Sequence, residues 1–136
     1  MTIANLETKI KTCVPSGYRF FSGRKSEYNF EKLVSDIVLF IPPREWPLNW
    51  RSDCSYDVEV EIWIGKIRSP KTETLTAFRD ALNTTATTMI DAINDINEVL
   101  VVESDVQASY WSTEEGQSVN TQEFVSFTLL LRIWST

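Results

Sequence analysis

The chain has 136 residues, which is enough for one hydrophobic core but below the size at which chains usually divide into domains. It contains 13 basic residues, 19 acidic residues and no histidine, so its formal net charge is −6. Without histidine the chain cannot supply a Ser-His-Asp triad, a Cys-His pair or a histidine-ligated zinc. The acidic balance argues against broad contact with nucleic-acid phosphates or an anionic membrane, since both need clustered positive charge. We therefore expect a single domain, residues 1–136.

The two cysteines and the N-terminal segment indicate where the protein is made. Cys13 and Cys54 lie far apart and belong to no metal-binding motif, so we expect buried, reduced thiols rather than a disulfide. Residues 1–12 carry Glu7, Lys9 and Lys11 among apolar residues, which is not the pattern of a signal peptide. The longest apolar runs are far shorter than the ~20 residues of a membrane span. We expect synthesis in the cytosol and no membrane partner.

The first 41 residues are predicted to form a helix and two strands. Apolar residues at steps of three and four, namely Ile3, Leu6, Ile10 and Val14, predict a helix that residues 15–17 terminate. Residues 18–21 are typical of a short strand. Residues 33–40 predict a second strand, which must end at the following two prolines because proline cannot donate to a sheet ladder.

Residues 42–55, with the sequence PPREWPLNWRSDCS, form a segment that we call the arm. One interpretation is a long hairpin connection whose Trp46 and Trp50 fold back over the core. The other is an exposed arm that docks on a neighbouring subunit, because Trp and Arg are enriched among interface anchors. Proline would stiffen such an arm and lower the entropy lost on docking. The candidate contact residues are Arg44, Trp46, Trp50 and Arg51.

Strict alternation over residues 56–64 predicts a strand with two different faces. Its even positions are apolar and suit a core, whereas its odd positions are Asp57, Glu59, Glu61 and Trp63. Residues 65–68 are predicted to form a basic turn, and Ser69 followed by Pro70 is a good helix start.

A long helix is predicted next. Apolar residues advance by three or four through Leu75, Phe78, Leu82, Ala86, Met89, Ile93 and Ile96, which indicates a helix of about 26 residues and about 39 Å. Its exposed side would carry Asp80, Asn83, Asp91, Asn94 and Asp95.

The end of the chain predicts further strands. Residues 99–110 suggest a strand or a bent pair of strands, and residues 112–122 a polar loop. Residues 124–134 are apolar on nearly both faces, as in a central strand covered on each side. The element order predicts an α+β fold: an antiparallel sheet of about four to six strands, one long helix packed across it and a short N-terminal helix.

The sequence contains little that points to catalysis. Glu59 and Glu61 share a strand face about 7 Å apart, which fits either a carboxylate acid/base pair or an ordinary solvated face. Asp105, Glu114 and Glu115 lack the spacing of a calcium loop. Scattered single glycines form no phosphate cradle. We expect no catalytic residues, metal or cofactor, with a carboxylate-based enzyme as a less favoured alternative.

The layout resembles the tail terminator and related neck or tail-completion proteins of long-tailed bacteriophages. The matching pieces are the N-terminal helix, the segment YRFFSG, the strand ending LFIPP, the arm, the strand YDVEVEIWI, the long helix and the terminal strand EFVSFTLLLRIWS. The resemblance implies a structural virion protein that forms a homo-oligomeric ring, commonly a hexamer. Such a ring caps the tail tube and presents a surface to the head connector.

A ring of this kind would need its acidic charge, because DNA must pass through the lumen without binding. Two sets of residues could line the lumen: Asp57, Glu59 and Glu61 on the strand, or Asp91 and Asp95 on the helix. The arm is the first candidate for the subunit contact, and residues 112–122 are the second, facing the tube or the connector. The alternative function is a non-catalytic interaction module, such as a host-interaction or inhibitor protein, that binds a protein partner through its Trp/Arg loop.

Overall fold

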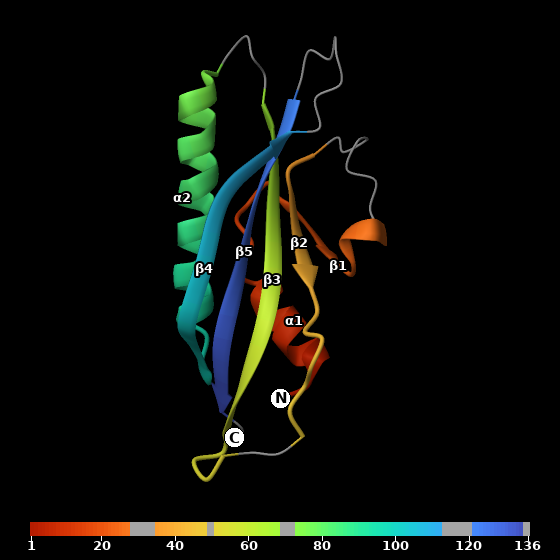
Figure 1. The fold of residues 1–136 in the computed structure, drawn as a ribbon, viewed down its shortest axis with the longest axis vertical. Coiled ribbons are helices and arrows are strands. Elements are labelled where there is room, and N and C mark those ends of the chain that lie inside the picture. Colours follow the sequence, from red (N-terminus) through yellow and green to blue (C-terminus); the bar gives the residue numbers. More distant parts are fainter. Residues whose placement is uncertain (28–34, 49–50, 69–72, 113–120, 135–136) are drawn as a thin grey trace.

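The computed structural model describes residues 1–27, 35–48, 51–68, 73–112 and 121–134. These residues form an α+β fold in the element order that the sequence predicts (Figure 1). The elements are α1 (Ile3–Lys11), β1 (Arg19–Ser22), the 3-10 turn η1 (Lys25–Glu27), β2 (Ile37–Ile41), β3 (Ser55–Arg68), α2 (Leu75–Asn94), β4 (Val99–Ser112) and β5 (Thr121–Trp134).

The five strands form one sheet in the order β1-β2-β3-β5-β4. Three of its pairings are antiparallel, but β1 and β2 are parallel, so the predicted antiparallel sheet is in fact mixed. A parallel pair needs a connection of about a dozen residues or more to return the chain to the same end of the sheet. Residues 23–36 are long enough to be such a connection, whereas the prediction of an antiparallel sheet did not include a parallel pair.

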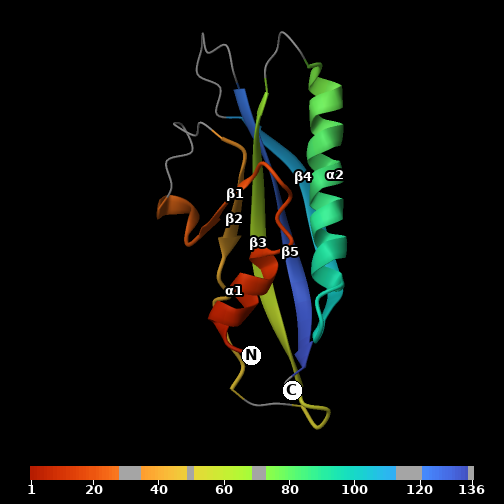
Figure 2. The same ribbon diagram turned by 180° about the vertical axis from the view of Figure 1, so that it is seen from behind.

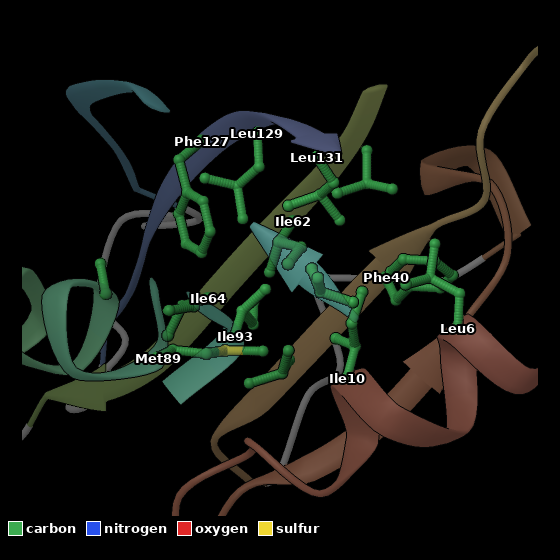
Figure 3. Packing of buried hydrophobic residues seen from close by; sticks show 14 of the residues in the cluster. Leu6, Ile10, Phe40, Ile62, Ile64, Met89, Ile93, Phe127, Leu129 and Leu131 are labelled. Carbon is green, nitrogen blue, oxygen red and sulfur yellow. The ribbon is translucent and has the colours of Figure 1, made fainter. Parts of the chain in front are cut away.

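Both helices cover the same face of the sheet. In Figure 2 α1 lies in front of β2 and β3, and α2 runs along the β4 side. The main core lies between the helices and the sheet, where Leu6 and Ile10 of α1 approach Phe40 of β2 (Figure 3). On the α2 side, Met89 and Ile93 lie close to Ile64 in the same view. All five even positions of β3 from Tyr56 to Ile64 are buried here, as the alternation predicts.

Helix α2 begins later and ends earlier than predicted. Its N-cap is Thr74, whose hydroxyl oxygen accepts a hydrogen bond from the Ala77 N–H at 3.2 Å. The helix has 20 residues and Ile96 lies beyond its end, although Ile96 still packs against the core. The predicted start at Ser69 and Pro70 lies outside the described residues. The predicted periodicity through Phe78, Leu82, Ala86, Met89 and Ile93 is confirmed, since all five side chains are buried.

Strand β3 continues through the segment that was predicted to be a turn. Gly65 pairs with Ile37 of β2 on one side and with Phe124 of β5 on the other. A Cβ on Gly65 would lie 2.3 Å from Cε1 of the Phe124 ring, so the ring occupies the space that any other side chain would need. Glycine here therefore allows a close approach within the strand rather than ending it.

An ion pair ties α2 to the sheet. The Arg79 guanidinium donates to both carboxylate oxygens of Glu123, at 3.2 and 2.9 Å, and the Glu123 side chain is only 5% exposed. A buried carboxylate is costly unless it is paired in this way. The pair joins residues far apart in the sequence, so the sequence alone does not indicate it.

Replacing Gly65 with alanine is expected to destabilise the protein by about 1–3 kcal/mol, because the added methyl group must displace the Phe124 ring. Chemical denaturation followed by circular dichroism measures the change. In a Phe124→Leu background the cost of Gly65→Ala should be smaller, since the ring atom is gone. Equal costs in both backgrounds would contradict the steric explanation.

Candidate functional site

The sheet face opposite the helices, which we call the open face, is not covered by either helix. In Figure 1 the strands lie in front of α1, and in Figure 2 α1 lies in front of them. Residues directly opposite one another on paired strands share a face. Side chains at odd positions of β3 therefore lie on the same face as side chains at even positions of β5. On the open face Trp63 is opposite Ser126, Glu61 is opposite Thr128 and Glu59 is opposite Leu130.

One end of the open face is apolar. Ile37, Leu39 and Phe124 are buried there and form a second hydrophobic cluster with Phe21, Ile41 and Trp63. The rings of Trp63 and Phe124 meet edge to face, with centroids 6.5 Å apart. Trp63, which alternation places with the acidic residues, thus belongs to a small core on this side of the sheet.

The remainder of the open face carries an acidic strip, defined as Glu59, Glu61, Glu103 and Asp105. Leu130 of β5 lies between Glu59 and Glu103, and Thr128 lies between Glu61 and Asp105. Neighbouring strands are about 4.8 Å apart, so the carboxylates of β3 and β4 flank β5 in two rows. Glu59, Glu103 and Asp105 are exposed, and Glu61 is half-buried.

A β-bulge explains why the sequence did not place Glu103 and Asp105 on this strip. Simple alternation puts both on the face of Val99 and Val101, which pack toward the helices. The register of β4 shifts between Val101 and Glu103, so one extra residue turns the following side chains to the other face. The signal that could have revealed the bulge is the run of four apolar residues before Glu103, in which alternation already fails.

Asp57 differs from the other acidic residues of β3. Arg132 donates to its two carboxylate oxygens at 3.0 and 3.4 Å, and Arg51 of the arm donates to the same oxygens at 3.2 and 2.6 Å. The hydrogen bond from Arg132 is the main reason why the pKa of Asp57 lies below its ordinary value. Two guanidinium groups thus neutralise Asp57, which makes it an anchor for the arm rather than a free negative charge.

The arm rests on the protein at two points. The ring of Trp46 meets Tyr56 edge to face with centroids 5.3 Å apart, and it packs against the main core. Arg51 holds the far side of the arm to Asp57. The core-covering interpretation is therefore right for Trp46, whereas Arg44 and Arg51 are exposed and Trp50 lies outside the described residues. Leu48, which the sequence analysis did not single out, is 86% exposed.

A groove of about 580 Å³ runs between the arm and the open face. Pro42, Arg44, Glu45 and Pro47 line it from the arm, and Glu59, Glu61, Thr128 and Leu130 are among the residues that line it from the sheet. The two carboxylates on β3 thus lie on the wall of an open groove next to an arginine. This arrangement matches a solvated strand face and does not single out either carboxylate as an acid or a base.

The other residues considered as sites lie elsewhere. Asp91 and Asp95 are exposed at the end of α2, away from the acidic strip. The described parts of the chain contain no cluster of three or more residues that could hold a metal ion. Glu114 and Glu115, with most of the predicted loop of residues 112–122, fall outside the described residues. Cys13 is half-buried, and its pKa is raised by burial. Cys54 is exposed, in contrast to the prediction, since it lies in the turn that closes the arm, where its backbone has a positive φ of 62°.

No family model and no curated protein matches the chain. Among solved structures it is similar to a protein from Akkermansia muciniphila that was solved without its transmembrane region, at 13% identity and a TM-score of 0.31. The match covers 97% of this chain and 52% of that one, so the chain spans about half the length of that structure. A likeness at this TM-score carries no argument about function. Among the described helices of the present chain, none has the length and apolar character to cross a membrane.

The Asp57 ion pairs predict a pH dependence of stability. Because its folded pKa is lowered, Asp57 contributes stability above its unfolded pKa of about 3.9, and this contribution is lost as the pH falls through the folded pKa. Wild type should therefore have a higher melting temperature than Asp57→Asn at pH 7, and the difference should shrink below about pH 4. Circular dichroism melts from pH 7 to pH 3 measure it.

The matched control is Glu59→Gln, since no ion pair of Glu59 is found among the described residues. Its melting temperature should stay close to that of wild type over the same range. A pH-independent gap between wild type and Asp57→Asn would contradict the assignment.

Proposed function

We propose that the chain is a ring-forming tail terminator or neck subunit of a long-tailed bacteriophage, and therefore a structural virion protein without catalytic activity. In this role a homo-oligomeric ring, most simply a hexamer, caps the tail tube and joins it to the head connector. The proposal rests above all on the acidic strip of the open face. The resemblance in element order supports it, since the helix, arm and strand positions follow the expected layout.

The acidic strip suits the lining of a DNA passage for an electrostatic reason. Glu59, Glu61, Glu103 and Asp105 face the same side of one sheet, and no cation of the described residues is paired with them in a salt bridge. Repeated around a ring, such a surface repels phosphates and keeps DNA mobile. We therefore assign the lumen to the acidic strip rather than to Asp91 and Asp95. Asp57 is left out because Arg51 and Arg132 neutralise it.

The second candidate is a non-catalytic interaction module that binds a protein partner through the arm. Leu48 favours it, because its side chain is 86% exposed between the points where Trp46 and Arg51 anchor the arm, and its burial against a partner would be favourable. In this case the protein remains a monomer, and Leu48→Ser weakens binding to the partner without changing the melting temperature. In the ring, the same arm contributes an apolar contact to a neighbouring protein.

Light scattering after size exclusion distinguishes these candidates. The ring proposal predicts a closed oligomer of defined mass, and negative-stain micrographs should show a central opening wide enough for duplex DNA. A protein that stays monomeric at high concentration, in both low and high salt, would overturn the ring and favour the interaction module.

Reversing the charge of the strip tests the lumen assignment. The ring of Glu59→Lys is expected to retain duplex DNA at low salt, and the binding should weaken steeply as salt is raised, because it depends on counterion release. Wild type should retain none in an electrophoretic mobility assay. Asp80→Lys is the matched control, since it makes the same charge change at an exposed position of α2. If both variants bind DNA equally, the open face does not line the passage.

A further inference from the structure

Charge is distributed unevenly along the chain and across the molecule. Twelve of the 13 basic residues lie within residues 1–79, whereas residues 80–131 contain no basic residue and nine of the 19 acidic ones. The strand order places these two parts of the chain on different sides of the sheet, because β1, from the first part, and β4, from the second, form its opposite edges. Figures 1 and 2 both show α2 beside β4 on one side, and β1 and η1 on the other. Residues 1–79 hold the other ten acidic residues and carry a net charge of +2, against −9 for residues 80–131. The subunit therefore has a strongly acidic side and a mildly basic one.

The acidic side includes residues that helix stability does not explain. The C-terminal end of a helix carries a partial negative charge and favours cations. Helix α2 has no basic residue in its last turn and instead carries exposed aspartates at Asp91 and at its C-cap, Asp95. Each of these residues opposes the helix dipole. An unfavourable charge at a helix end that brings no gain in stability is typical of a functional position.

The adjacent edge strand is closed to further strand pairing but offers an apolar contact. The outward N–H of Val101 is bonded to the Asn94 side-chain oxygen at 2.9 Å, and the bulge at Val102 interrupts the ladder. Leu100 and Val102 are 41% and 42% exposed at this edge. A partner here would therefore contact side chains, with two apolar residues flanked by acidic ones, rather than extend the sheet.

The basic side has complementary properties. Arg19 of β1 and Arg24, which follows β1, are exposed, and neither forms a salt bridge with the described residues. Arg19 lies over the Phe21 ring at 5.3 Å, on the open-face side of the edge strand β1, and its side chain is exposed. Helix α1 is joined to this strand because the Ser22 hydroxyl donates to Glu7, and it adds Lys9 and Lys11 in its last turn.

We propose that copies of this chain join head to tail, with the acidic α2–β4 side of one copy packed against the basic α1–β1 side of the next. This inference rests on the ring function proposed above and identifies its subunit contact. Two different and complementary surfaces on one chain are what a heterologous contact requires, and a ring results when the rotation between copies closes. Charge complementarity also selects this orientation, because two acidic sides or two basic sides repel each other.

Charge reversal on each side tests the contact. In Asp91→Lys/Asp95→Lys both sides become basic, and the dissociation constant should rise about a hundredfold. The melting temperature of the separated subunit should rise slightly, because lysine suits the helix end. A merely structural role of the aspartates would instead lower stability and leave assembly intact. Arg19→Glu/Arg24→Glu makes both sides acidic and should likewise prevent assembly.

Mixing the two variants gives the sharpest readout. When the two variants meet, one kind of contact joins the unchanged basic side of the aspartate variant to the unchanged acidic side of the arginine variant. The other kind joins their two reversed sides. Both kinds of contact pair a basic side with an acidic one. The mixture should therefore assemble in a 1:1 ratio although each variant alone is monomeric by light scattering. Glu59→Lys is the control, since it reverses a charge on the open face, outside both proposed contact sides, and should assemble normally.

The outcomes separate this inference from the ring function. If wild type forms rings and both double variants also do so, the proposed contact is wrong while the ring function stands. If wild type forms open filaments that the variants abolish and the mixture restores, the contact is right and the ring is wrong. A wild type that stays monomeric overturns both.

Discussion

The structure depends on the antiparallel pairing of β3 with β5. The two strands pair from Ser55 opposite Trp134 to Arg68 opposite Thr121, and they occupy the middle of the sheet. This register determines which side chains of both strands face the helices and which form the open face. Its tightest point is Gly65, where the Phe124 ring leaves no room for a Cβ. A slip by one residue would bury the carboxylates of β3 and expose its valines and isoleucines.

The pairing also makes the two faces of the sheet unequal in burial and charge. Helices α1 and α2 fill one face with the main core, and a smaller cluster around Phe124 covers one end of the other. What remains is a solvated surface with carboxylates on both sides of β5. The acidic excess of the chain is thus divided between this strip and the α2–β4 edge. In the ring that we propose, the strip would face DNA and the edge would face a neighbouring copy.

Local patterns predicted those parts of the fold that local forces decide. Alternation in β3 and the three- and four-residue steps of α2 were confirmed because burial of one face enforces them. Predictions failed where contacts between residues far apart in the sequence decide the local structure. Gly65 was assigned to a turn, although Phe124 holds it in a strand. The first two strands were assigned to an antiparallel sheet, although β1 and β2 pair in parallel. Similarly, the bulge in β4 became visible only from its pairing with β5.

The sequence by itself determined the element order, the α+β class, the apolar face of each main element and the separation of charge along the chain. Tertiary structure alone decided where the charges lie in space. It neutralised Asp57 with Arg51 and Arg132, turned Glu103 and Asp105 onto the open face, and packed Trp46 against Tyr56. The physical reason is that strand register, bulges and ion pairs join residues far apart in the chain. Their energies depend on distance and burial, which a local pattern of residues does not contain.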